Sequence, residues 1–179
     1  LVARELFALA RGQPRPALRD ACKVTLVEHL FRGAVDRPDH IHRRGIVHAD
    51  IKPENILLPT DGGPPRLADF GLAGLLGRPG SLRGSLPYTA PEVLKGEAPG
   101  KASDLYALGA TLYRARTGEG PFDAPTVEET ITGHLTRPPR FDAAVFSTLP
   151  RGLPPLLARL LAKDPAARPR SGAEVLEAL

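Results

Sequence analysis

The 179-residue sequence contains no methionine, no tryptophan and only one cysteine, Cys22. A single cysteine excludes a disulfide framework within the chain and any metal site built from several cysteines. No apolar run approaches the roughly 18 residues that a membrane-spanning helix needs, so we expect no membrane segment within these residues. Because methionine is absent and the first residue is Leu1, we expect the sequence to be part of a longer protein or to begin at an unusual start codon.

Aromatic residues are also scarce, at 5% of the chain. The formal net charge of +4 is compatible with a nucleic-acid partner, but the basic residues are scattered and are densest only at 43–44 and 137–140. No aromatic side chains are interleaved with them to stack on bases. The sequence therefore favours a solvated basic surface, and we expect no nucleic-acid partner.

The chain does have the composition of a folded domain, with 42% hydrophobic and 25% charged residues. Its length suits one domain that buries roughly 70% of the surface of the unfolded chain. Its 18 glycines and 20 prolines indicate that much of this domain lies in loops.

The spacing of apolar residues predicts a mainly helical fold. Three groups recur at helical spacing and predict buried stripes: Leu18, Cys22, Leu26 and Leu30; Leu105, Leu108 and Leu112; and Leu153, Leu156, Leu157, Leu160 and Leu161. We expect the second of these helices to stop near Thr117-Gly118. Two pairs with capping-box spacing predict further helix starts: Thr126 with Glu129, and Ser171 with Glu174.

One dense turn, residues 59–65, predicts a small β-hairpin between 56–58 and 66–68. The glycine-rich stretch 72–88 shows no sustained period, and we expect a long loop there. A hairpin of this size would bring Asp69 back beside Asn55, which follows Asp50 by five residues. Phosphoryl transfer needs such a set, because oxygen ligands must hold a metal ion and a carboxylate must orient the attacking hydroxyl.

Three segments resemble the motifs of protein kinases. The run from His48 to Asn55 resembles their catalytic loop, Asp69-Phe70-Gly71 resembles their metal-binding triplet, and Ala90-Pro91-Glu92 resembles the end of their activation segment. The likeness continues through 103–109 and, at several shorter motifs, to the end of the chain. Lys52 followed by Pro-Glu-Asn is typical of serine/threonine-specific members. The preference for Arg, Ala, Gly and Pro over Lys indicates a bacterial source with a GC-rich genome, so we expect the bacterial, eukaryotic-like type.

This resemblance implies the large, C-terminal lobe of the kinase fold, mainly α with a small β-hairpin, over residues 17–179. Residues 1–16 would be a lead-in, either a hinge remnant or a short helix, and the N-terminal lobe would be absent. No Gly-x-Gly-x-x-Gly loop occurs in the sequence. Ala21-Cys22-Lys23 resembles the kinase strand lysine only superficially, because it falls in a predicted helix and too close to Asp50.

The resemblance also implies an activity. The full-length protein would transfer the γ-phosphate of ATP to serine or threonine hydroxyls of a protein substrate, with ATP and Mg²⁺ as cofactors, while this chain alone would be inactive. It would work in the cytoplasm, either free or as the cytosolic part of a membrane-anchored protein. Asp50 would be the catalytic base, Lys52 would contact the transferred phosphate, and Asn55 and Asp69 would bind magnesium.

Other residues would support this site by the same resemblance. The Ser85 hydroxyl would bond Asp50 and Lys52, and Asp104 would brace the backbone of the catalytic loop. Glu92 would form a structural ion pair with Arg168 in the helical core. His48 is interpreted as a packed core residue that braces the loop rather than as a metal ligand, because no metal-site spacing accompanies it.

One position departs from the family pattern. Ala49 stands where most members carry an arginine that binds a phosphorylated residue of the activation segment. Without this charge-assisted partner, we expect activity to depend little on phosphorylation of the segment, although Ser81 offers a hydroxyl there.

Two other functions stay open. A pseudokinase or protein-docking module would bind another protein without chemistry, and a small-molecule phosphotransferase of related fold would act on a different substrate. The presence of Asp50, Lys52 and both metal ligands argues against the first, since a scaffold has no physical need for them. Ala90-Pro91-Glu92 and the helices after it argue against the second, because they resemble a platform for protein substrates.

Overall fold

The computed structural model describes residues 41–57, 59, 63, 65–70, 74–75, 85–146 and 151–178. The lead-in over 1–16, the predicted helix that carries Cys22, and Ser81 lie outside these residues. In the described part of the chain, no helix combines the length and the hydropathy needed to cross a bilayer.

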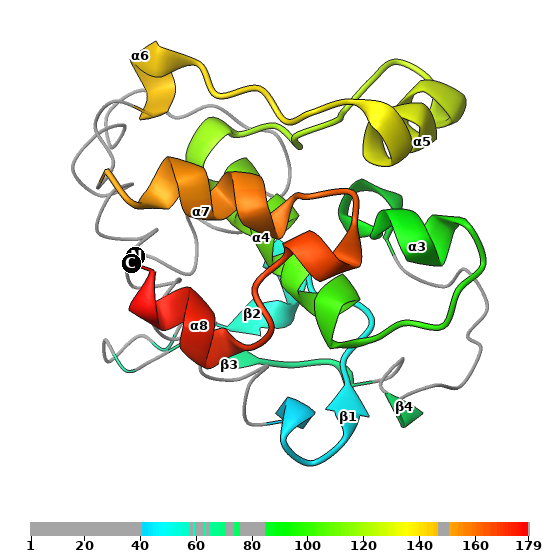
Figure 1. Ribbon diagram of the computed structural model, residues 1–179, viewed down its shortest axis with the longest axis vertical. Helices are drawn as coiled ribbons and strands as arrows, with labels where there is room; N and C mark the ends of the chain where they lie inside the picture. The colour runs from blue at the N-terminus through cyan, green and yellow to red at the C-terminus, as the bar shows by residue number, and fades with distance from the viewer. Residues whose placement is uncertain are drawn as a thin grey trace.

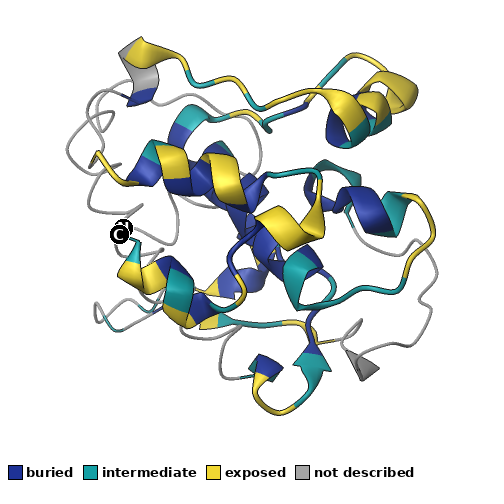
Figure 2. Ribbon diagram, in the orientation of Figure 1, coloured by how far each residue is buried: buried dark blue, intermediate teal, exposed yellow. Residues whose placement is uncertain are grey.

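Helix α4 (Lys101–Thr117) runs through the middle of the structure, with α7 (Leu153–Leu160) packed along it (Figure 1). Leu105, Leu108 and Leu112 are fully buried, as their spacing predicts. Figure 2 shows that α4 is buried nearly throughout, so it is a central helix rather than one with a single apolar face. The helix ends at Gly118, whose left-handed φ of 87° is readily adopted only by glycine.

The contact between α4 and α7 depends on one small residue. The predicted leucine stripe is buried, and Leu160, at the end of α7, lies opposite Gly109 of α4. A Cβ atom placed on Gly109 would be 2.8 Å from the Cβ of Leu160. The close approach of the two helices therefore requires glycine at this position.

Both predicted helix starts are confirmed. Thr126 accepts the backbone N–H of Glu129 at 3.2 Å at the start of α5 (Val127–Thr136). Ser171 accepts the backbone N–H of Glu174 at 3.2 Å at the start of α8 (Gly172–Glu177). The carboxylate of Glu174 departs from the capping-box pattern, because it accepts the backbone N–H of Arg170 and pairs with Arg159.

The described residues also contain two pairs of short antiparallel strands. The predicted hairpin is present as β2 (Ile56–Leu57) and β3 (Arg66–Leu67), with Ile56 opposite Leu67. A second pair, β1 (Ile46–Val47) with β4 (Gly74–Leu75), was not expected. The prediction of a continuous loop over 72–88 is therefore wrong, since this stretch contains both β4 and the 3-10 helix η4 (Leu86–Tyr88).

The other elements with bounds inside the described residues are single turns that carry no sequence period. They are the 3-10 helices η2 (Pro53–Asn55) and η5 (Pro165–Ala167) and the short helices α3 (Pro91–Leu94) and α6 (Ala143–Phe146). Proline occupies one of the first two positions of η2, η4, α3 and η5, where its missing N–H has no partner to lose. These turns connect the strands to the helical core and place the candidate site residues.

Candidate active site

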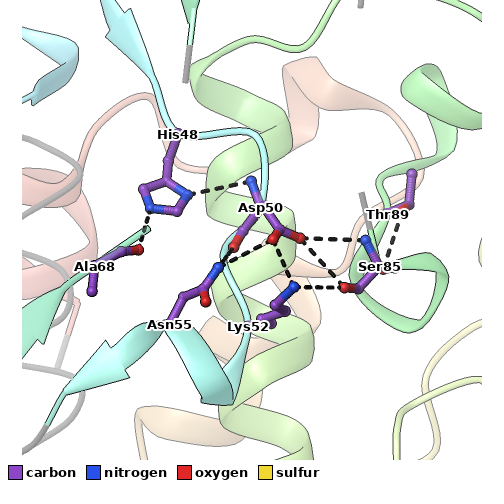
Figure 3. A network of polar contacts seen from close by, with 7 residues as sticks. All are labelled: His48, Asp50, Lys52, Asn55, Ala68, Ser85 and Thr89. Atoms are coloured by element: carbon purple, nitrogen blue, oxygen red, sulfur yellow. Dashed lines mark hydrogen bonds and ion pairs between the residues drawn. The ribbon is translucent and has the colours of Figure 1, made fainter. Parts of the chain in front are cut away.

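The candidate site lies on the loop between β1 and β2, where Asp50 is the centre of a polar network (Figure 3). One carboxylate oxygen, Oδ2, accepts hydrogen bonds from Lys52 Nζ at 2.7 Å and Asn55 Nδ2 at 3.1 Å. The other, Oδ1, accepts the Ser85 backbone N–H at 3.3 Å and the Ser85 hydroxyl at 3.4 Å. Lys52 Nζ also donates to Ser85 Oγ at 3.0 Å, so the structure brings these four predicted residues together.

These donors determine the charge of Asp50. Burial would raise the pKa of its carboxyl, but the hydrogen bond and charge of Lys52, together with the donors from Ser85 and Asn55, outweigh it. The net result is a pKa below the ordinary value, so the carboxylate is ionised at neutral pH. All of its roughly four lone-pair positions face a donor.

Asn55 has an orientation suited to a metal ligand. Its Nδ2 donates to the Asp50 backbone carbonyl at 2.8 Å as well as to the carboxylate. Because both neighbours are acceptors, the amide nitrogen must face Asp50, and the side-chain oxygen points the other way (Figure 3). Proline at position 53 starts the turn η2 that presents this side chain.

The hairpin returns the chain to Asn55 immediately before Asp69. The backbone carbonyl of Asn55 accepts the N–H of Ala68 at 2.8 Å. Asp69 is exposed and has a left-handed φ of 60°, a conformation that aspartate tolerates better than most residues. The hairpin therefore brings Ala68, the residue before Asp69, into contact with Asn55.

This donor set fits Mg²⁺. A carboxylate and an amide oxygen are hard ligands, and Mg²⁺ is usually held by one or two such groups together with phosphate oxygens and water. Among the residues that the structure describes, no group of three or more His, Cys, Asp and Glu side chains gathers to hold a metal ion. A magnesium ion bound by Asn55 and Asp69 would take its other ligands from phosphate and water.

Asp104 of α4 holds the loop between β1 and β2 in place through its carboxylate. Its carboxylate accepts the backbone N–H groups of His48 at 2.8 Å and Ala49 at 2.9 Å, and His42 Nε2 at 2.8 Å. Ala49 has a φ of 65°, which costs an alanine roughly 1–2 kcal/mol. The N–H of Ala49 and the N–H before it both donate to Asp104, which holds the backbone in this conformation. His42 is a supporting residue that sequence reasoning missed, since its partner lies 62 positions away.

His48 is a fully buried brace, in agreement with its interpretation from sequence. Its Nδ1 accepts the Asp50 backbone N–H at 3.3 Å, and its Nε2 bonds the Ala68 carbonyl at 3.0 Å. The tautomer with the proton on Nε2 satisfies both bonds. The ring also packs against Phe70 at a centroid distance of 4.8 Å. His48 thus joins the catalytic loop to the segment that carries Asp69.

Glu92 and Arg168 lie away from this network and form the expected ion pair between α3 and the segment after η5. The two carboxylate oxygens accept from Arg168 Nη1 at 2.7 Å and Nη2 at 2.8 Å. The side chain of Arg168 is fully buried. The pair therefore connects two distant parts of the chain within the helical core.

Comparison with known sequences supports the reading of these motifs. The family described as "Protein kinase domain" matches residues 14–178. The serine/threonine-protein kinase PknJ of Mycobacterium tuberculosis is 38% identical over 178 residues, covering 93% of this chain and 30% of PknJ. PknK of the same species is 43% identical over 144 residues, covering 77% of this chain and 13% of PknK.

A third relative is the DNA damage-responsive serine/threonine-protein kinase RqkA of Deinococcus radiodurans. It is 41% identical over 140 residues, covering 75% of this chain and 21% of RqkA. The chain thus spans less than a third of the length of these curated relatives. The match to the family extends over most of the chain and includes every motif described above, and the chain belongs to the protein kinase domain family.

Proposed function

We propose that this chain is the catalytic part of a serine/threonine protein kinase that transfers the γ-phosphate of ATP to a serine or threonine hydroxyl of a protein. The observation that carries the proposal is the ionised Asp50 carboxylate, which accepts from Lys52 and Asn55 at Oδ2 and from Ser85 at Oδ1. The names of the relatives PknJ, PknK and RqkA support the same activity.

In this proposal Asp50 orients the acceptor hydroxyl more than it removes the proton early. A carboxylate whose pKa lies below its ordinary value is a weak base, so it accepts the proton only as the new oxygen–phosphorus bond forms. The acceptor hydroxyl would take the place of the longest contact on this carboxylate, the 3.4 Å bond from Ser85 Oγ. The reacting oxygen would then lie beside the ammonium group of Lys52.

Lys52 and the two metal ligands would manage the charge of the phosphate. Lys52 Nζ donates to both Asp50 and Ser85, and in this proposal it would also contact the transferred group. Asn55 and Asp69 would hold Mg²⁺, which when bound neutralises the charge on the phosphate oxygens. The turn η2 and the hairpin β2–β3 would hold these two ligands in position.

We further propose that residues 17–179 form the large lobe of the kinase fold, with 1–16 as its lead-in. The motifs described here run from the catalytic loop to the last helix, and all belong to the half of the fold that binds magnesium and protein substrate. Without the glycine loop and strand lysine that normally hold ATP, the 179-residue chain would turn over far below the ordinary range of about 1–100 per second.

The activity is tested on the full-length protein that contains this chain, with Mg²⁺, radiolabelled ATP and a serine-containing protein substrate. We expect Asp50→Asn to lower kcat by about 100-fold or more, since it removes the charge that orients the hydroxyl. Glu128→Gln, which neutralises an exposed carboxylate on α5, is the matched control and should leave kcat unchanged.

Two results would contradict the proposal. A folded parental protein that transfers no phosphate to any protein would favour the pseudokinase or docking alternative. If Asp50→Asn kept the parental kcat, Asp50 would have no role in phosphoryl transfer.

A further inference from the structure

The backbone carbonyl of Ser85 is held by two donors. It accepts the N–H of Tyr88 at 2.9 Å, which closes the turn η4, and the side-chain hydroxyl of Thr89 at 3.2 Å. Thr89 is 9% exposed, and its hydroxyl points back along the turn to Ser85 (Figure 3). A buried hydroxyl needs such a partner, because leaving it unpaired is costly.

The turn itself does not need this second bond. The backbone N–H of Thr89 donates to the carbonyl of Leu86 at 3.1 Å, so backbone groups alone close both ends of η4. The hydroxyl of Thr89 therefore adds a contact that is specific to residue 85. A valine at position 89 would fill the same volume and lack only this contact.

The position of Ser85 must be held closely, because its contacts with Asp50 are long. Its N–H and its hydroxyl reach Asp50 Oδ1 at 3.3 and 3.4 Å, close to the distance at which a hydrogen bond ceases to be one. A displacement of a few tenths of an ångström would lose both contacts. Serine also lacks the second Cβ substituent that stiffens threonine, so its hydroxyl is less restricted by its own side chain.

We propose that Thr89 is a positioning residue for phosphoryl transfer: by fixing the carbonyl of Ser85, it holds the N–H of Ser85 at Asp50 and the hydroxyl of Ser85 at Lys52. This inference rests on the proposed kinase function of the Asp50 site. It assigns to Thr89 a role that the kinase-like motifs of the sequence do not include.

The main test compares Thr89→Val with Thr89→Ser in the full-length protein. We expect Thr89→Val to lower kcat by about three- to tenfold, the effect of one lost hydrogen bond, with little change in KM for the protein substrate. Thr89→Ser keeps the hydroxyl and should restore the parental kcat. A Thr89→Val enzyme with parental kcat, or one altered only in KM, would overturn the inference.

Thr130 provides a matched control. Its hydroxyl also donates to the carbonyl four residues earlier, Thr126 O, at 3.0 Å, and it is 7% exposed. It belongs to α5, which makes no hydrogen bond to the Asp50 network among the described residues. Thr130→Val should therefore leave kcat unchanged, and an equal fall in both variants would identify a general effect of losing a buried hydroxyl.

A double-mutant cycle separates positioning from stability. If Thr89 acts through Ser85, Thr89→Val should lower kcat less in a Ser85→Ala background, where the hydroxyl that it positions is already gone. Effects that multiply independently would show that Thr89 acts elsewhere and would contradict the inference.

Hydrogen exchange gives a readout that needs no activity. The Ser85 amide is protected by its bond to Asp50, so we expect it to exchange about three- to tenfold faster in Thr89→Val and at the parental rate in Thr130→Val. Unchanged exchange at Ser85 would overturn the inference. If the parental protein transferred no phosphate, the proposed function would fail, and this measurement would still decide whether Thr89 positions Ser85.

Discussion

The ion pair between Glu92 and Arg168 allows a sharp prediction about stability. All five N–H groups of the Arg168 guanidinium have acceptors, and two of these acceptors are the carboxylate oxygens of Glu92. The other three acceptors are the backbone carbonyls of Ala162, Ala102 and Lys163. Glu92→Ala would leave two N–H donors of a fully buried cation without a partner and its charge without compensation.

The expected cost follows from this burial. Breaking a buried ion pair by removing one partner costs about 3–5 kcal/mol, a large share of the roughly 5–15 kcal/mol by which a domain is stable. The pair between Arg159 and Glu174 is the matched control, since its side chains are 46% and 35% exposed. Arg159→Ala should cost at most about 1 kcal/mol, as is usual for exposed pairs.

Urea unfolding at pH 7, followed by circular dichroism and extrapolated to water, measures both costs. A third variant, Glu92→Leu with Arg168→Leu, removes both charges and should recover part of the stability lost in Glu92→Ala, because no unpaired charge remains buried. A loss below about 1 kcal/mol in Glu92→Ala, equal to that of Arg159→Ala, would refute the reasoning.

Two further predictions concern the helical core. Burial, and to a smaller extent the charge of Lys163, lowers the pKa of His134 from 6.5 to about 4. Between pH 6.5 and pH 4 the unfolded chain therefore binds a proton that the folded protein does not, and the free energy of unfolding falls as the pH falls through this range. Between pH 7 and pH 4, the free energy of unfolding measured with urea should fall by up to about 3 kcal/mol less in His134→Gln than in the parental protein. An equal fall in both proteins would contradict the lowered pKa of His134. Gly109→Ala should lower the free energy of unfolding by roughly 1–2 kcal/mol, because overpacking against Leu160 outweighs the higher helix propensity of alanine, and a raised melting temperature would contradict this.

The parts of the fold that could be predicted are those with a period or a local signal. The leucines of α4 and α7 recur at helical spacing because those helices pack against each other along their length. Thr126 and Ser171 mark helix starts because a cap acts within three residues. Elements of two to four residues, such as β1, β4, α3 and α6, contain too few residues for a period to show, and their formation depends on tertiary contacts.

The residues of the candidate site likewise fall into those that the sequence could predict and those that it could not. Asp50, Lys52 and Asn55 are found in one short motif, so the sequence presents them together. His42 and Thr89 carry no such signal. His42 reaches Asp104 across 62 positions, and the bond from Thr89 to Ser85 exists only because η4 brings the hydroxyl back over the turn.

The structure also explains why the departure at Ala49 leaves the site intact. Asp104 holds the loop through the backbone N–H groups of residues 48 and 49, and neither bond depends on the side chain at position 49. Because Asp104 is buried in the central helix α4, the backbone at Ala49 is held by the helical core. The bonds that hold the loop therefore do not depend on the side chain at position 49, and we expect the geometry of the site to be set by the helical core rather than by phosphorylation of the activation segment.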